Sequence, residues 1–247
     1  MAKQKGITPF VGTLGGINFY YLKGKPVARK AGGGFNSKAI KSKGSMQRVR
    51  ENASEFAHCS QVNKVFRQAL RPFYQGVKFS SFHSYLMRLF LGLKDLDGVH
   101  ARGQRRVGSG VDTAEGTLLL QQFDYTPACD ITTVLPFKFV YDASNYTLTI
   151  LDFNISKVAF LPGATHVELL YGVLDFNFET LDYDLHLASS LVLDRNYSGG
   201  GLYLEPSTLP TGIGTCLAVT GVRFYQEVDG ELYMLKDQTG VGLVVGC

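Results

Sequence analysis

The chain of 247 residues has no apolar run of 18 residues or more, which excludes a membrane-spanning helix. Residues 1–10 are polar and basic and contain no apolar stretch like that of a secretory leader, so we expect no conventional signal peptide. The four cysteines, at positions 59, 129, 216 and 247, are far apart and form no Cys-x-x-Cys motif or Cys/His cluster. This spacing argues against structural zinc, and without an export signal it predicts reduced thiols.

The sequence also lacks the common catalytic patterns. Its five histidines form no His-x-His or His-Glu-x-x-His motif, and no Gly-x-Ser-x-Gly elbow exposes a nucleophilic serine. Residues 12–16 are rich in glycine but lack the lysine and the following helix of a phosphate-binding loop, so we interpret them as a turn. Four acids without a calcium-loop pattern are interpreted as a solvated strand edge: Asp175, Glu179, Asp182 and Asp184. We therefore expect a protein that is not an enzyme, with no catalytic residue, no metal site and no cofactor.

Charge divides the chain, although 45% hydrophobic and 19% charged residues are ordinary values for a globular protein. Residues 1–106 contain 20 Lys and Arg and four acids, whereas residues 107–247 contain five Lys and Arg and 17 acids. This asymmetry indicates a segment that binds a polyanion or docks on an acidic partner. A solvated basic helical face beside an unrelated acidic domain is the plainer alternative.

The first thirty residues predict a small β-meander. Short apolar runs at residues 10–14, 17–22 and 26–29 are separated by a Gly-Gly pair and a Lys-Gly-Lys turn. Two or three such strands are too few to be stable alone, so the meander needs a partner surface in its own chain or in a neighbour. Residues 31–44, rich in Gly, Ser and Lys, predict a flexible basic linker that ends at Ser45, an expected helix N-cap.

Helical periodicity then replaces the strand pattern. Apolar residues recur every three or four positions over residues 46–73 and again over residues 80–96, which predicts two amphipathic helices in a hairpin. Residues 99–110 read as a basic loop with a glycine hinge at the charge boundary.

Beyond residue 116 the chain reads as β-structure. Turn signals separate the candidate strands, and Asp229-Gly230 gives the clearest hairpin. The sequence thus predicts an α+β fold, with an N-terminal β-meander arm and a helical hairpin followed by a C-terminal antiparallel β-sandwich of jelly-roll or immunoglobulin-like type. The expected domains are residues 1–44, 45–110 and 111–247. The candidate strands are residues 118–125, 137–141, 146–153, 157–160, 166–177, 183–193, 216–227, 231–236 and 240–245.

Several sequence phrases carry a resemblance. Residues 1–7 read Met-Ala-Lys-Gln-Lys-Gly-Ile, residues 12–20 read Gly-Thr-Leu-Gly-Gly-Ile-Asn-Phe-Tyr, and Ala-Arg-Lys follows at 28–30. A helix like residues 47–56 and the phrases Pro-Gly-Ala-Thr-His at 162–166 and Phe-Tyr-Gln-Glu-Val-Asp-Gly at 224–230 complete the set. In these features the chain resembles a group of uncharacterised proteins from Bacteroidetes and their prophages. The resemblance implies no activity, but its phage association implies a virion or filament subunit.

Two functions stay open from the sequence. In the first, the chain is a non-enzymatic structural subunit that self-assembles into a filament, tube or shell, because its basic arm docks on the acidic domain of the next copy. In the second, the basic half binds nucleic acid through its phosphates, and aromatic residues 19–21 either stack on bases or simply pack in a strand. We expect synthesis in a bacterial cytoplasm. The sequence leaves the final location open, with a virion or an extracellular filament as the candidates. The candidate assembly or polyanion-binding residues are Lys3, Lys5, Lys23, Lys25, Arg29, Lys30, Lys38, Lys41, Lys43, Arg48, Arg50, Arg102, Arg105 and Arg106.

Overall fold

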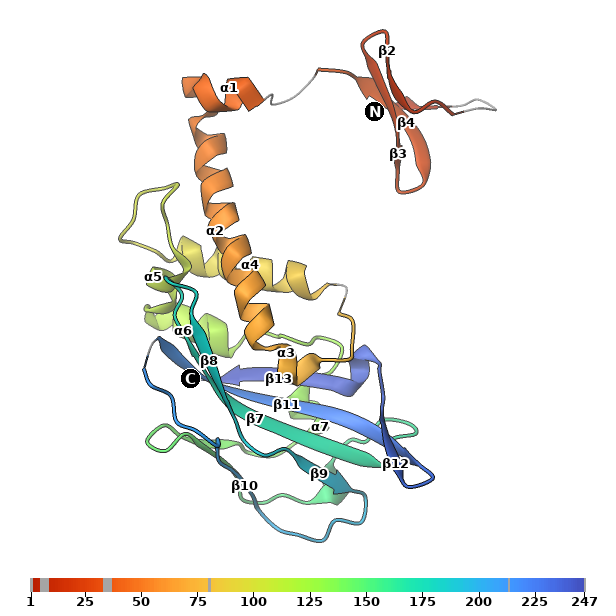
Figure 1. The fold of residues 1–247 in the computed structure, drawn as a ribbon, viewed down its shortest axis with the longest axis vertical. Coiled ribbons are helices and arrows are strands. Elements are labelled where there is room, and N and C mark those ends of the chain that lie inside the picture. The colour runs from red at the N-terminus through yellow and green to blue at the C-terminus, as the bar shows by residue number, and fades with distance from the viewer. Residues whose placement is uncertain (1, 5–8, 33–36, 80, 213, 247) are drawn as a thin grey trace. The chain divides into compact units, whose positions relative to one another are not determined.

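The computed structural model describes residues 2–4, 9–32, 37–79, 81–212 and 214–246 (Figure 1). These residues form two compact units, Met1–Asn52 and Ala53–Cys247. The boundary at Asn52 is not one of those that composition and charge predicted. Helices and antiparallel sheets both contribute, so the predicted α+β class is confirmed. In the part of the chain described, no helix is both long and apolar enough to cross a membrane.

A four-stranded antiparallel sheet forms most of the first unit. Its order is β1 (Ala2–Lys3), β4 (Lys25–Lys30), β3 (Ile17–Leu22) and β2 (Gly12–Leu14). Both tight turns have the positive φ angles of a type I′ hairpin, 57° and 74° at Gly15 and Gly16 and 50° and 74° at Lys23 and Gly24. The predicted meander is therefore confirmed, and β1 is a strand that the sequence pattern did not indicate.

The segment predicted as a linker contains regular structure. Helix α1 (Ser37–Ser42) lies within it, and a 3₁₀ turn, η1 (Gly44–Met46), leads into the long helix α2 (Gln47–Ala69). The expected N-cap at Ser45 is wrong, because Ser45 lies inside η1 and the residue before that turn, Lys43, makes no side-chain cap. Residues 33–36 of the predicted linker lie outside the described residues.

Two long strands form the centre of the second unit. β7 (His166–Phe176) pairs antiparallel with β11 (Thr215–Val228), and the sheet continues through β12 (Glu231–Met234) and β13 (Val241–Gly246) on the β11 side. On the other side, β7 pairs with β8 (Tyr183–Leu187) and β9 (Leu191–Asp194). The Asp229-Gly230 turn between β11 and β12 has φ angles of 53° and 83°, which confirms the predicted hairpin.

A smaller sheet covers one face of this six-stranded sheet. It consists of β5 (Val140–Asp142), β6 (Thr147–Ile150) and β10 (Leu202–Leu204), in the order β10-β6-β5. Leu148 and Leu204 of the small sheet pack with Tyr171 and Val173 of β7. β10 was not predicted, because three residues between glycine and proline carry too little pattern.

Helices cover the opposite face, and Figure 1 shows them on the other side of β7, β11 and β13 from β10. Phe66 of α2 and Phe90 of α4 (Phe82–Asp95) pack in one core with Leu174 and Phe176 of β7. Because β7 and β11 are buried on both faces, their sequences are almost continuously apolar. Helix α3 (Arg71–Tyr74) connects α2 to the loop before α4.

Two segments that we expected to be strands, residues 118–125 and 157–160, are not strands. Residues 118–121 lie in α6 (Ala114–Gln121), whose N-terminus is capped by Thr113, since its side chain accepts a hydrogen bond from the Gly116 amide at 3.0 Å. Lys157 ends a 3₁₀ turn, η2 (Ile155–Lys157), which Asn154 caps, and residues 158–160 form neither helix nor strand. The three consecutive leucines at 118–120 are compatible with either helix or strand, and the cap at Thr113 favours the helix. The chain also forms α7 (Ile131–Val134) and η3 (Gln238–Gly240).

The expected glycine hinge at residues 108–110 is wrong. These residues lie in α5 (Val107–Val111), and Gly108 and Gly110 are buried. A Cβ atom at Gly110 would lie 1.8 Å from the carbonyl oxygen of Leu93. Glycine is therefore required at this position so that α5 can approach α4 closely.

Candidate functional site

The sheet of the first unit has two chemically different faces. Residues opposite each other in an antiparallel register point to the same side, and neighbours along a strand point to opposite sides. On β3, therefore, Ile17, Phe19 and Tyr21 share one face, whereas Asn18, Tyr20 and Leu22 share the other. We call the face with Ile17, Phe19 and Tyr21 the apolar face and the opposite one the basic face, after the residues that the neighbouring strands add to each.

The apolar face consists mainly of large exposed side chains. Leu14 of β2 lies opposite Ile17, and Pro26 of β4 lies opposite Tyr21. The Phe10 ring lies 6.1 Å from the Phe19 ring, centroid to centroid. Leu14 is 73% exposed and Phe10 is 63% exposed. A sheet that leaves such residues uncovered has no core of its own on this side.

The basic face carries three of the predicted cations. Lys3, Lys25 and Arg29 occupy it by register, and Tyr20 lies among them. The Arg29 guanidinium lies 5.4 Å from the centre of the Tyr20 ring, within the range of a cation–π contact. Lys30 instead lies opposite Ile17 on the apolar face, and Lys23 occupies the turn between β3 and β4. Lys5 lies outside the described residues.

The other predicted cations of this unit lie on α1, in the following turn and at the start of α2. Lys38, Lys41 and Lys43 are exposed. Arg48 pairs with Glu51 at 2.9 Å. Arg50 has a local structural role, because its guanidinium donates to the carbonyl oxygens of Ile40 and Lys43 and so holds α1 against α2. The unit as a whole has eleven Lys and Arg and one acid.

Three predicted cations, Arg102, Arg105 and Arg106, belong to the second unit, and Arg105 forms an ion pair with a buried acid there. Arg105 donates to both carboxylate oxygens of Glu55, each at 2.8 Å, and lies 2.8 Å from Asp95. Lys94 donates to Glu55 at 3.1 Å. The hydrogen bond from Arg105 is the main reason why the pKa of Glu55 falls from 4.5 to about 2, and bonds from Gly103 and Lys94 contribute. Arg105 therefore closes the loop onto α2. Arg102 and Arg106 lie at exposed positions, and the Arg106 guanidinium is 3.3 Å from the His58 ring.

A second buried carboxylate fixes the same loop. Asp97 accepts backbone N–H bonds from Val99, His100 and Arg106, and its Oδ2 lies 2.8 Å from the His100 ring. Burial alone raises the pKa of Asp97, but these donors outweigh it and lower the pKa. The loop that the sequence predicted as a basic loop with a glycine hinge is thus held by two buried acids, Asp97 and Glu55.

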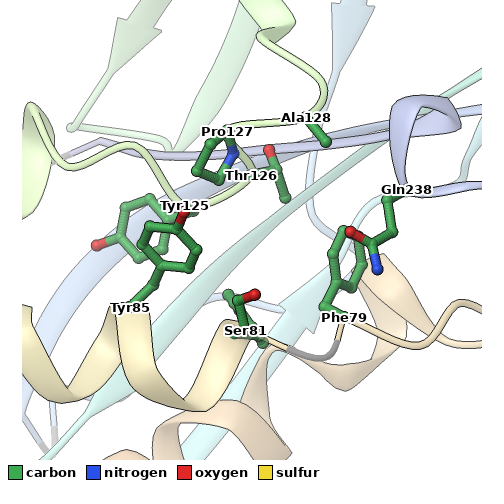
Figure 2. Close-up of a pocket in the computed structure, with 9 residues that line it drawn as sticks. Phe79, Ser81, Tyr85, Tyr125, Thr126, Pro127, Ala128 and Gln238 are labelled. Atoms are coloured by element: carbon green, nitrogen blue, oxygen red, sulfur yellow. The ribbon is translucent and has the colours of Figure 1, made fainter.

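The second unit also has a cavity of about 210 Å³ between the start of α4 and residues 125–128 (Figure 2). Tyr85 reaches it from α4, Ser81 from the position just before this helix, Pro127 from the loop, and Gln238 from η3. Two of its polar side chains already have partners, because Thr126 bonds to the backbone of Cys129 and Leu243 and Gln238 donates to Lys78. The cavity is smaller than ordinary ligand pockets.

Two buried thiols of this unit, those of Cys59 and Cys129, are poor nucleophiles. Burial raises the pKa of Cys59 and of Cys129 to about 11, so both are protonated at neutral pH. Among the described residues, no three His, Cys, Asp or Glu side chains come together in a way that would hold a metal ion.

Sequence reasoning missed the role of Glu55, although a signal was present. Positions 55, 59, 62 and 66 follow the helical repeat, and Cys59, Val62 and Phe66 are all buried. An acid on a buried stripe requires a cation, and Arg105 and Lys94 supply the charge. The division of the meander into two faces was also missed, because it depends on the pairing register.

Comparisons of the chain with protein-family models, with curated proteins and with solved structures find no match.

Proposed function

We propose that this protein is a non-enzymatic structural subunit that self-assembles into a filament, tube or shell, and that its first unit makes the contact between copies. The observation that carries the proposal is the exposed apolar face of a single-layered sheet. Burial of apolar surface is the main driving force for association, at roughly 25 cal/mol per Å². A sheet with such a face gains stability when a second surface covers it.

The kind of assembly follows from the kind of contact. A face on the first unit that binds a different surface of the next copy makes a head-to-tail contact, and such contacts give helical filaments or closed rings and shells. The phage association of the resembling proteins favours a virion or filament among these. The jelly-roll or immunoglobulin-like sandwich stays a prediction, supported by the packing of the small sheet on β7 through Leu148 and Leu204.

A pair of matched substitutions tests the proposal. Ile17 and Leu22 lie on the same strand and are 42% and 44% exposed, but they point to opposite faces. Ile17→Ser should abolish large particles in light scattering and in negative-stain microscopy, because it places a hydroxyl in the contact. Leu22→Ser, the control, should assemble like the wild type. Equal assembly by both variants would argue against the apolar face as the contact.

Nucleic-acid binding is the second candidate function, favoured by the grouping of Lys3, Lys25 and Arg29 around Tyr20 on the basic face. Cations bind phosphates and an aromatic ring stacks on unpaired bases. The double reversal Lys25→Glu/Arg29→Glu should then weaken binding of single-stranded DNA of any sequence. The slope of log affinity against log salt should fall by about 0.7 for each phosphate that the variant no longer neutralises. An unchanged slope would exclude this face as the binding site.

A further inference from the structure

The hairpin of β11 and β12 extends beyond the sheet to which it belongs. β11 pairs with β7 only as far as Tyr225 and with β13 only as far as Arg223. Beyond these points, only β12 pairs with the last β11 residues, Gln226, Glu227 and Val228. The end of the hairpin is therefore a two-stranded ribbon, and its residues from Gln226 to Tyr233 are exposed.

One side of this ribbon combines apolar residues with negative charge. Val228 lies opposite Glu231 and Gln226 lies opposite Tyr233, so these four side chains share one side. Val228 is 45% exposed and Tyr233 is 59% exposed. Asp229 occupies the turn, and residues 224–235 contain no Lys or Arg.

This surface complements the apolar face of the meander. The meander has exposed Ile17 opposite Lys30 and exposed Tyr21 nearer the turn that contains Lys23. The ribbon has exposed Val228 and Tyr233 beside Glu231, with Asp229 in its turn. Each side thus offers apolar side chains, one charge among them and one charge at the turn, with opposite signs.

We propose that the β11–β12 hairpin of a second copy of this chain is the surface that covers the apolar face of the meander. This inference rests on the proposed function and names the partner surface for it. Apolar contact supplies the affinity, and pairs such as Lys30 with Glu231 set orientation and speed encounter. The contact joins different surfaces of successive copies, so it propagates from one chain to the next.

Two other surfaces of the second unit that expose apolar residues fit less well. Val140 and Tyr203 share the outer face of the small sheet, but a basic residue, Lys138, lies in the chain just before β5. Tyr183 stacks on Phe176 and is the one large exposed apolar side chain of β8. Neither surface has two exposed apolar side chains whose charged neighbours are all acidic.

Two defective full-length chains test the inference together. The first, Ile17→Ser/Tyr21→Ser, loses the meander face and keeps the hairpin. The second, Val228→Ser/Tyr233→Ser, loses the hairpin and keeps the meander. Each alone should remain a monomer in sedimentation velocity, whereas an equimolar mixture should form a discrete complex of two chains, because only one intact contact is available.

The control is Tyr203→Ser, which removes an equally large side chain that is 56% exposed on β10 of the same unit. This variant should assemble like the wild type, and circular dichroism should show all variants folded. Assembly by Val228→Ser/Tyr233→Ser while Ile17→Ser/Tyr21→Ser stays monomeric would overturn the hairpin as partner and leave the proposed function standing. Monomers in the mixture would also overturn it. A monomeric wild type would overturn the proposed function and this inference together.

The charge pair gives an independent readout. Lys30→Glu and Glu231→Lys should each slow assembly several-fold at low salt, and the double reversal should restore most of the rate. Like charges within one contact repel, and exchanging both signs re-forms the pair. A double variant as slow as the slower single variant would show that these two residues do not meet.

Discussion

Arg105 and Glu55 lie 50 positions apart in the sequence and form a two-bonded ion pair, with both N–H···O distances at 2.8 Å. Glu55 is 3% exposed, and Lys94 beside it is 8% exposed. Desolvation of these charges is costly, so the pair stabilises the fold only while both signs are present. The ion pair between Arg105 and Glu55 holds the loop after α4 against α2.

Glu55→Gln should therefore destabilise the protein by about 3–5 kcal/mol, because the substitution leaves Arg105 and Lys94 without their buried counter-charge. Urea unfolding measures this change. Glu51→Gln is the matched control, one helical turn earlier on α2, where Glu51 pairs with Arg48, whose side chain is 68% exposed, and also accepts a hydrogen bond from Gln47. That substitution should cost less than about 1 kcal/mol. Equal losses of unfolding free energy in the two variants would show that the buried ion cluster stabilises the protein no more than an exposed ion pair does.

Stability should also depend on pH through Glu55. Its pKa is about 2 in the folded protein against an ordinary value of 4.5. Because this pKa is lower in the folded protein, the unfolded chain takes up the proton first as the pH falls. The stabilisation that ionised Glu55 gives the folded protein is therefore complete above pH 4.5 and is lost as the pH falls to 2. The loss is on the order of 3 kcal/mol.

Urea unfolding at a series of pH values checks this. The wild type should lose stability steeply between pH 4.5 and 2, and Glu55→Gln should lose less. Asp97, whose pKa is also lowered, leaves a residual dependence in both proteins. Parallel curves for wild type and Glu55→Gln would contradict the assignment.

The close approach of α5 to α4 predicts a strong effect at Gly110. Gly110→Ala should destabilise the protein by about 1–3 kcal/mol or more, because the added Cβ meets the backbone of Leu93. Gly98→Ala is the control, since a Cβ at Gly98 has no atom within 4 Å. Thermal unfolding should separate the two variants by several degrees. A Gly110→Ala protein as stable as the wild type would mean that the helices can move apart freely.

The sequence predicted the elements whose pattern is local and repeated. β7 and β11 are buried on both faces and read as long apolar runs, and Asp229-Gly230 identifies its own hairpin because few residues accept positive φ. Leu118 to Leu120 misled the prediction, since the same run suits a strand until the cap at Thr113 is considered. Short elements such as β10 carry too few residues for a pattern.

The candidate surfaces could be predicted only in part. The positive charge of the first unit is a property of composition, so it was evident from the residues alone. Which side of the sheet each cation occupies depends on register, and register separates Lys30 from Arg29 although they are neighbours. The capture of Arg105 by Glu55 depends on tertiary contact, and nothing local to residues 99–110 indicates it.

Salt should affect how fast the protein assembles. The screening length shortens from about 10 Å at 0.1 M salt to about 3 Å at 1 M, so attraction between the basic first unit and an acidic partner fades. The initial rate of light-scattering increase should fall as salt rises, while burial of Ile17 and Tyr21 keeps the final particles stable. A rate independent of salt would show that the charge division has another purpose.

The most direct test of the central claim is the mass of the wild-type chain in sedimentation velocity over a range of protein concentrations, beside Ile17→Ser. We predict that the wild type forms species of many copies as its concentration rises, whereas Ile17→Ser stays at the 27.1 kDa of one chain. A wild type that remains at 27.1 kDa at every concentration would contradict self-assembly through the apolar face.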